Sequence, residues 1–313
     1  MNPVLLTLIQ TVVVLALAPF VLGCVRMFKA RLQGRRGANP FLTYYAFATL
    51  LRKQMVISDN VSWVFRLVPF VVLTSSVFLA LVLPLIVLGG ALSAYSNLFV
   101  VAGVLVIGAI FLVLGGLDTA SAFGGMGSSR EMTITSLLEP TVIMTFATLA
   151  LVTGSPTIGR MITADVALTH APFLILTFSA LGLIALAENA RYPVDNPATH
   201  LELTMVHEAM VLEYSGPYLA MLEYASALKL TVFAILIGNF LFPVALATSV
   251  SSIDAVLFAI VIAALKAVVA MGVLALLEST IAKMRFYRMQ EYLTGAFFLA
   301  LSGLVLALIQ HAV

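Results

Sequence analysis

The sequence predicts an all-α integral membrane protein with eight transmembrane helices and a long acidic cytoplasmic loop between helices five and six. Three observations predict this class: 62% of the 313 residues are hydrophobic, only 10% are charged, and the mean hydropathy is +1.13. A soluble protein carries about 25% charged residues. Apolar runs such as residues 98–114 are continuous, which excludes the alternating pattern of a membrane β-barrel.

Each predicted span is an apolar run of about 20 residues, the length that crosses the hydrocarbon core with its backbone polar groups paired inside one helix. The spans are 4–25, 67–89, 98–117, 132–154, 172–188, 219–244, 252–277 and 292–310. Residues 1–313 thus form one predicted membrane domain. Its two long loops are a basic cytoplasmic loop, 26–66, and an acidic cytoplasmic loop, 188–216.

The positively charged residues predict how these helices are oriented. All but three of the sixteen Lys and Arg residues fall in loops on one side of the predicted membrane. The exceptions are Arg160, on the other side, and Lys229 and Lys266, inside spans. Because cytoplasmic loops retain positive charge, both termini are predicted to be non-cytoplasmic. Within the basic loop, residues 41–53 have the spacing of an interfacial helix that rests on the lipid bilayer.

The acidic loop combines many carboxylates with little positive charge. Pro193 and Pro197 favour an extended first third, and a helix is predicted from about 198 to 214. Carboxylates that share a low-dielectric face cannot all ionise, which suits proton relay. The alternative is a solvated acidic face that meets a partner. The acids in this loop are Glu188, Asp195, Glu202, Glu208 and Glu213, against the single cation Arg191.

Ionisable side chains inside predicted spans are costly in a bilayer and are functional candidates for that reason. Glu139 lies about seven residues into the fourth span, and Pro140 after it favours a kink that admits water. Glu223 and Lys229 enter the sixth span, and Lys266 lies in the seventh. The alternative for each is a salt-paired or snorkelling side chain with a structural role only.

Other kinds of site find little support. Cys24 is the only cysteine, which excludes an iron–sulfur cluster held by this chain alone. His200 and His207 lack the spacing of metal ligands, and no catalytic triad is visible, so no catalytic or metal-binding residue is predicted. Nothing in the sequence indicates nucleic-acid binding.

The glycine-rich segment 115–131 lacks the pattern of a phosphate-binding loop. Its glycines are expected to permit tight turns and close backbone approach. Asp118, Arg130 and Glu131 are expected to form a local polar group there, and Glu278, at the inner end of the seventh span, is expected to be interfacial.

Several short motifs, in a fixed order along nearly the whole chain, are similar to those of one family. They are Arg35-Arg36-Gly37, Gly116-Leu117-Asp118-Thr119, Ser129-Arg130-Glu131, Glu139-Pro140, Glu188 with Pro193-Val194-Asp195, Glu213-Tyr214-Ser215-Gly216, and a basic stretch around Arg285. With them the chain resembles the complex I subunit 1 family, NADH dehydrogenase subunit 1. It looks closest to the branch found in formate hydrogenlyase and other energy-converting nickel–iron hydrogenases.

The resemblance implies a multi-pass subunit of the prokaryotic cytoplasmic membrane that binds no cofactor itself. Its implied partners are a peripheral arm with hydrogenase-like large and small subunits, an iron–sulfur subunit, and antiporter-like membrane subunits. Iron–sulfur clusters and a nickel–iron site would lie in those partners. The implied role is to dock the arm and to link electron transfer to proton or sodium translocation.

The resemblance also suggests residue roles. It makes seven acids candidate protonation sites: Glu131, Glu139, Glu188, Asp195, Glu202, Glu208 and Glu213. It also implies that Arg36 and Arg130 would shape the quinone cavity in a true complex I. Glu223, Lys229 and Lys266, singled out above for their place in the spans, complete the proton-relay candidates, and Arg35, Asp118, Arg191 and Arg285 complete the cavity or interface candidates. The hypothesised mechanism is electrostatic: a change in protonation of the acidic loop would alter the pKa of Glu139 and of a Glu223–Lys229 pair.

The chain departs from the complex I pattern in two places, which favours the hydrogenase branch. The run after Asp195 is NPATHLELTMVHEAMVLEYSG where complex I relatives have an LPEAE-like run, and Gly37 is followed by Ala38-Asn39-Pro40. Three alternatives stay open. They are a quinone-binding heel subunit of complex I, in which residues 41–53 and the acidic loop line the quinone chamber, an independent ion transporter, and a passive anchor without a proton role.

Overall fold

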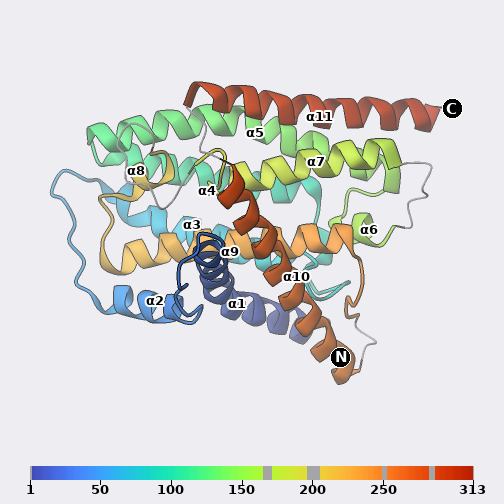
Figure 1. Ribbon diagram of the computed structural model, residues 1–313, viewed down its shortest axis with the longest axis horizontal. Helices are drawn as coiled ribbons and strands as arrows, with labels where there is room; N and C mark the ends of the chain where they lie inside the picture. Colours follow the sequence, from blue (N-terminus) through green and yellow to red (C-terminus); the bar gives the residue numbers. More distant parts are fainter. Residues whose placement is uncertain (1, 165–170, 196–204, 249–251, 282–285, 313) are drawn as a thin grey trace.

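The computed structural model describes residues 2–164, 171–195, 205–248, 252–281 and 286–312, and these residues form a bundle of α-helices (Figure 1). No strand occurs in the described ranges, only the isolated bridges Val87–Ala247 and Asn97–Thr157. Both chain termini lie at one end of the bundle, called here the far end. The short helices α2 and α8 lie at the other, called here the near end (Figure 1).

The long helices follow the predicted spans, with shifted ends. They are α1 (Pro3–Leu32), α3 (Trp63–Val82), α4 (Leu98–Asp118), α5 (Ala122–Thr153), α7 (Ala171–Glu188), α9 (Gly216–Leu241), α10 (Ile253–Thr280) and α11 (Phe286–Ala312). The short ones are α2 (Leu42–Arg52), α6 (Ile158–Thr163), α8 (His207–Val211) and the 3₁₀ turn η1 (Ser93–Tyr95). Within the described residues, seven helices are long and apolar enough to cross a membrane, and α7 is a shorter apolar helix. The chain is therefore a multi-pass membrane protein.

Two of the shifted helix ends have a clear local reason. The second span was expected to run to residue 89, but α3 ends at Val82. Pro84 explains this end, because the residue before a proline is driven out of the helical region. The fourth span was expected to begin at 132, but α5 begins at Ala122, where the Ser121 side chain accepts a hydrogen bond from the N–H of Gly124 and caps the helix.

The glycine-rich segment is therefore mostly helical, and its single tight turn joins α4 to α5. The expected close approach of the backbone is confirmed. A Cβ atom on Gly116 would collide with the Ser128 hydroxyl, and one on Gly127 would lie 2.9 Å from the Cβ of Ala209 in α8. The glycines thus let α4, α5 and α8 pack together at the near end.

A continuous helix from about 198 to 214 is not present. In the described part of that range only α8 is helical, and Val206 before it has the non-helical angles φ −120° and ψ −78°. Glu202 and His200 lie outside the described residues.

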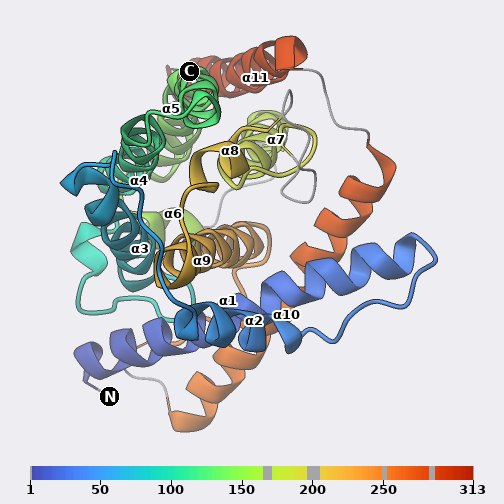
Figure 2. The same cartoon turned by 90° about the vertical axis from the view of Figure 1, so that its left-hand side faces the viewer.

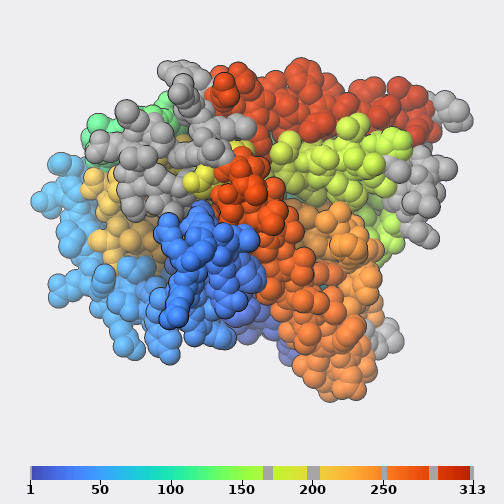
Figure 3. Space-filling view, in the orientation of Figure 1, coloured from blue at the N-terminus to red at the C-terminus, as the bar shows by residue number. Residues whose placement is uncertain are grey.

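Helix α9 lies at the centre of the bundle and packs against α1, α2, α3 and α10 (Figure 2). α10 crosses one face of the molecule diagonally (Figure 3). Its inner side carries small residues such as Ala259, Ala263 and Ala267, which are buried, whereas Val261 and Leu265 are exposed. This division is typical of a membrane helix, because small residues allow close helix approach and aliphatic ones face lipid.

Candidate functional site

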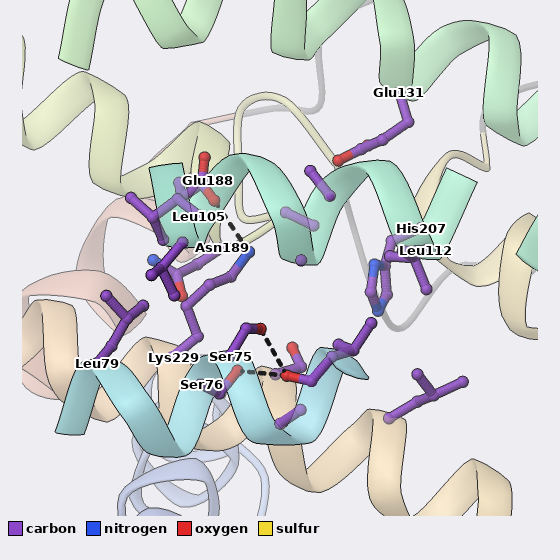
Figure 4. Close-up of a pocket in the computed structure, with 18 residues that line it drawn as sticks. Ser75, Ser76, Leu79, Leu105, Leu112, Glu131, Glu188, Asn189, His207 and Lys229 are labelled. Atoms are coloured by element: carbon purple, nitrogen blue, oxygen red, sulfur yellow. Dashed lines mark hydrogen bonds and ion pairs between the residues drawn. The ribbon is translucent and has the colours of Figure 1, made fainter. Parts of the chain in front are cut away.

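A small polar cavity lies between α3, α4, α5, α7, α8 and α9 (Figure 4). Its volume is about 50 Å³, whereas a single water needs roughly 10–15 Å³ on the same scale. Four ionisable side chains from four different helices line it: Glu131 from α5, Glu188 from α7, His207 from α8 and Lys229 from α9. We call it the site cavity, and it has room for a few water molecules.

An ion pair crosses the site cavity. The Lys229 ammonium donates to the Glu188 carboxylate over 3.2 Å (Figure 4). The Glu188 side chain is only 11% exposed and that of Lys229 28% exposed. The prediction of a Glu223–Lys229 pair is therefore wrong. Lys229 pairs with Glu188, and Glu223 is exposed on α9. Glu188 is the last residue of α7, whereas Lys229 lies in the middle of α9, so the pair joins the end of one apolar helix to the centre of another.

Glu188 connects the site cavity to a second, smaller cavity of about 20 Å³ between α4 and α5. Glu139 lines this second cavity, and Glu188, Leu105 and Ala109 line both. Three of the predicted relay acids, Glu131, Glu188 and Glu139, thus follow one another around two adjoining cavities. The arrangement can pass a proton through water and carboxylates.

His207 presents a neutral imidazole to the site cavity. Burial, with Lys229 nearby, lowers the pKa of His207 from 6.5 to about 4, although Asp195 opposes this shift. Asp195 is 2% exposed, and its carboxylate accepts a hydrogen bond from the backbone N–H of His207 over 3.1 Å. Asp195 therefore fixes the start of α8 and with it the position of the imidazole.

Asn189 adds an acceptor to the site cavity. Its side-chain N–H donates to the Ala185 carbonyl, whereas no donor among the described residues reaches its buried Oδ1 atom. Buried polar atoms almost always have a partner. The Oδ1 atom, in a residue that lines the site cavity, is therefore suited to hydrogen-bond a water molecule there.

A second buried charge cluster lies beside the site cavity and was not predicted. Glu278, expected to be interfacial, is 6% exposed. Its carboxylate pairs with Lys29 of α1 at 3.2 Å and with Arg191 at 3.5 Å, and the Lys29 ammonium lies 4.9 Å from the centre of the Tyr192 ring. Burial lowers the pKa of Arg191, and the Glu278 charge opposes the shift. This triad ties the segment after Glu188 to α1 and α10.

The expected polar group of Asp118, Arg130 and Glu131 does not form as a unit. Asp118 accepts from the backbone N–H groups of Ser62 and Phe65 and so caps the start of α3. Arg130 donates to the Met205 carbonyl over 2.8 Å, next to α8, while Glu131 lines the site cavity. Each residue anchors a different neighbour.

The other predicted residues are spread over the molecule. Arg35, Arg36 and Glu213 are exposed, and Glu208 is half-buried on α8. Lys266 does not line the site cavity, because its ammonium donates to the Asn239 side chain over 2.8 Å at the far end. Glu202 and Arg285 lie outside the described residues.

Sequence reasoning missed His207, Asn189 and Glu278 as parts of polar clusters. A single buried histidine and a helix-terminal glutamate give no pattern along the chain, because their partners are distant in sequence. The one available signal was the run Glu188-Asn189-Ala190-Arg191 directly after an apolar span, which places polar groups at the end of a membrane helix. No group of three potential metal ligands occurs in the ranges that the structure describes.

Comparisons with known proteins agree with this architecture. The family described as NADH dehydrogenase matches residues 4–310. Hydrogenase-4 component C of Escherichia coli is 32% identical over 90% of this chain and 89% of its own length, and formate hydrogenlyase subunit 4 of the same organism is 33% identical over 90% and 91%.

The fold also matches a solved structure. A chain of the membrane-bound sulfane sulfur reductase, an archaeal respiratory membrane complex, superposes with a TM-score of 0.83 over 98% of this chain and 100% of that one, at 14% identity. That identity supports the shared fold alone. Together with the family match and the two relatives, it leads to one conclusion: this chain belongs to the NADH dehydrogenase family, as a membrane subunit of the complex I-like, hydrogenase-4 and formate hydrogenlyase type of respiratory complex.

Proposed function

We propose that this chain docks a peripheral redox arm of the hydrogenase-4 or formate hydrogenlyase type and couples its electron transfer to the movement of protons or sodium ions. The observation that carries the proposal is the Glu188–Lys229 ion pair, which stands at the junction of the two cavities. Ionisable groups at membrane depth cost several kcal/mol, and they mark ion pathways for that reason. The chain itself supplies charge and protons, and the redox chemistry belongs to its partners.

The proposed step is an exchange of partners around Glu188. When a proton reaches Glu188 from the side of Glu131 and His207, the carboxylate loses its charge and Lys229 loses its ion partner. The charge of the Lys229 ammonium is then no longer balanced by Glu188, so the ammonium repels a proton held at Glu139 more strongly than before. This repulsion favours release of the proton from Glu139. Glu188 then passes its proton across the second cavity to the vacated Glu139, and the charged Glu188 pairs with Lys229 again, which resets the cavity.

The near end is the proposed cytoplasmic side, with both termini on the opposite side. Arg52 and Lys53, at the end of α2, are exposed there. Together with the exposed Arg35 and Arg36 they are proposed as the basic residues that meet the peripheral arm. Hydrogenase-like large and small subunits and an iron–sulfur subunit are the proposed occupants, holding the iron–sulfur clusters and the nickel–iron site. Antiporter-like subunits are proposed as the membrane neighbours that take up the translocated ion.

The cavity dimensions favour proton transfer over the quinone alternative. A cavity of about 50 Å³ suits a few waters rather than a quinone head group. Tightly bound quinone in the purified complex, with turnover blocked by quinone-site inhibitors, would instead support a complex I heel subunit. Transport by the purified chain alone in liposomes would support an independent transporter.

The proposal is tested in the purified, assembled complex. Glu131→Gln, Glu139→Gln and Glu188→Gln remove one titratable proton each with almost no change in volume. Ion movement per turnover is expected to fall by roughly tenfold in the Glu188 variant, as for loss of a positioned proton carrier. The matched control is Glu223→Gln, on α9 but exposed. Wild-type ion movement in all three cavity variants would leave the chain as a passive anchor.

A further inference from the structure

An irregular segment, residues 83–88, closes the far end of the bundle between α3 and η1. The side chains of Leu83, Leu85, Ile86 and Val87 are at most 3% exposed. The segment contacts Gln10, which lies seven residues, or about 10 Å, in from the start of α1. Non-helical backbone at membrane depth persists only where protein satisfies its polar groups.

The backbone groups of this segment are almost completely paired. All five of its N–H groups, from Leu83 and from Leu85 to Leu88, donate to a protein acceptor. The carbonyls of residues 83–86 all accept a hydrogen bond, and part of the pairing comes from Ala247, which exchanges hydrogen bonds with Ile86 and Leu88. Such complete pairing fixes the segment in one conformation.

Two buried amide side chains supply most of the remaining partners. The Gln10 N–H₂ group donates to the carbonyls of Ala80 and Leu83 over 3.0 and 2.8 Å, and its oxygen accepts from the N–H groups of Ile86 and Val87 over 3.0 and 2.9 Å. This uses all four hydrogen-bonding positions of a glutamine amide. Gln10 is therefore built into the segment as a cross-brace.

Asn239 braces the segment from the other side. Its N–H₂ group donates to the carbonyls of Pro84 and Leu85 over 3.1 and 2.9 Å, and its oxygen accepts from the Lys266 ammonium over 2.8 Å. Lys266 also donates to the Val244 carbonyl over 3.0 Å. The lysine thus holds Asn239 with its N–H₂ group facing the segment, and three helices, α1, α9 and α10, brace it together.

Two cavities lie near the segment. Leu79, four residues before the segment, lines the site cavity, whereas Leu83, its first residue, lines a cavity of about 410 Å³ at the far end. Gln10, Pro84 and Val87 line this far cavity as well, together with the exposed Arg160. The segment therefore forms part of the wall of the far cavity, and it follows directly along the chain from the turn of α3 that lines the site cavity.

We propose that residues 83–88, braced by Gln10, Asn239 and Lys266, are a seal that prevents ions from leaking through this chain between the site cavity and the far cavity. In this assignment Lys266 is a positioning residue that takes no part in proton transfer. This role explains why Gln10, Asn239 and Lys266 are polar at membrane depth although they relay no protons. Ions handled at Glu188 and Glu139 must then leave through a neighbouring subunit.

The test is passive ion leak through the purified, assembled complex in liposomes, without electron donor. A potassium diffusion potential drives protons, and an internal pH dye records their passage. The wild-type complex is expected to leak no more than empty liposomes. Gln10→Ala and Asn239→Ala remove braces from buried backbone groups, and the leak is expected to rise by on the order of tenfold. Because no turnover is needed, the result is independent of the proposed coupling function.

Two controls sharpen the test. Thr11→Val changes a buried neighbour of Gln10 whose hydroxyl donates to the Thr7 carbonyl of the same helix, and it is expected to leave the leak unchanged. Lys266→Gln keeps a donor for Asn239 but removes the charge. If Lys266 only positions Asn239, this variant should show a low leak and unchanged ion movement per turnover. If Lys266 carried protons, ion movement per turnover should be lost.

Hydrogen exchange of the wild-type complex tests the seal without any variant. The amides of Ile86 and Val87 are expected to exchange as slowly as those in the middle of α9. Rapid exchange of these amides overturns the proposal, and so does a wild-type leak in assembled Gln10→Ala and Asn239→Ala complexes. If neither variant assembles, the exchange rate decides.

Discussion

Replacing Lys229 with methionine tests the electrostatics of the site most sharply. The two charges are 3.2 Å apart, and at an effective dielectric constant of about 20 their attraction is roughly 5 kcal/mol. The lysine is 28% exposed, so screening reduces the usable part to about 2–4 kcal/mol. Loss of the lysine leaves the Glu188 carboxylate almost buried and without its ion partner, and the free energy of unfolding of the assembled complex is expected to fall by roughly that amount.

Thermal unfolding of the purified, assembled complex measures this loss. Lys229→Met is expected to melt at a lower temperature than the wild type. Lys229→Met combined with Glu188→Gln is expected to recover part of the difference, because no almost buried anion is then left unpaired. Glu223→Gln, on the same helix but exposed, should leave the melting temperature unchanged. A Lys229→Met complex as stable as the wild type would refute the reasoning, because the ion pair would then not stabilise the bundle.

Three further predictions concern stability, each read from thermal unfolding of the assembled complex. Folding lowers the pKa of His207 from 6.5 to about 4. The free energy of unfolding is therefore highest, as far as this histidine is concerned, above pH 6.5, and about 3 kcal/mol of it is lost as the pH falls to 4. His207→Gln should flatten that pH dependence, and an unchanged profile would contradict it. Glu278→Gln leaves two cations without their buried anion and should cost about 3–5 kcal/mol; an unchanged melting temperature argues against the triad. Gly127→Ala meets Ala209 at 2.9 Å and should cost roughly 1–3 kcal/mol, whereas Gly125→Ala, with open space around it, should stabilise by up to about 1 kcal/mol.

The sequence predicted the membrane helices well because apolar length is a local property. All eight expected spans coincide with a helix, including α7, which is short for a span. Helix ends were less predictable. Pro84 ended α3 early, and the Ser121 cap started α5 ten residues before the apolar run begins. Caps and prolines are visible in the sequence, but hydropathy alone does not weigh them.

The site was predictable as a set of acids but not as an arrangement. Glu131, Glu139 and Glu188 were candidates, and they do line adjoining cavities. The partner of Lys229 was not predictable, because Glu223 is six residues away along the chain and Glu188 is 41. A contact between α7 and α9 depends on how the whole bundle packs, and a single sequence does not show which distant residues come together.

The most direct test of the central claim is the number of ions moved per turnover by liposomes that contain the complete complex. Wild-type and Glu188→Gln complexes are measured side by side, with Glu223→Gln as the control for substitution in the same region. Coupling through the Glu188–Lys229 pair predicts a roughly tenfold loss in the Glu188 variant alone. A Glu188→Gln complex that moves as many ions per turnover as the wild type would contradict it.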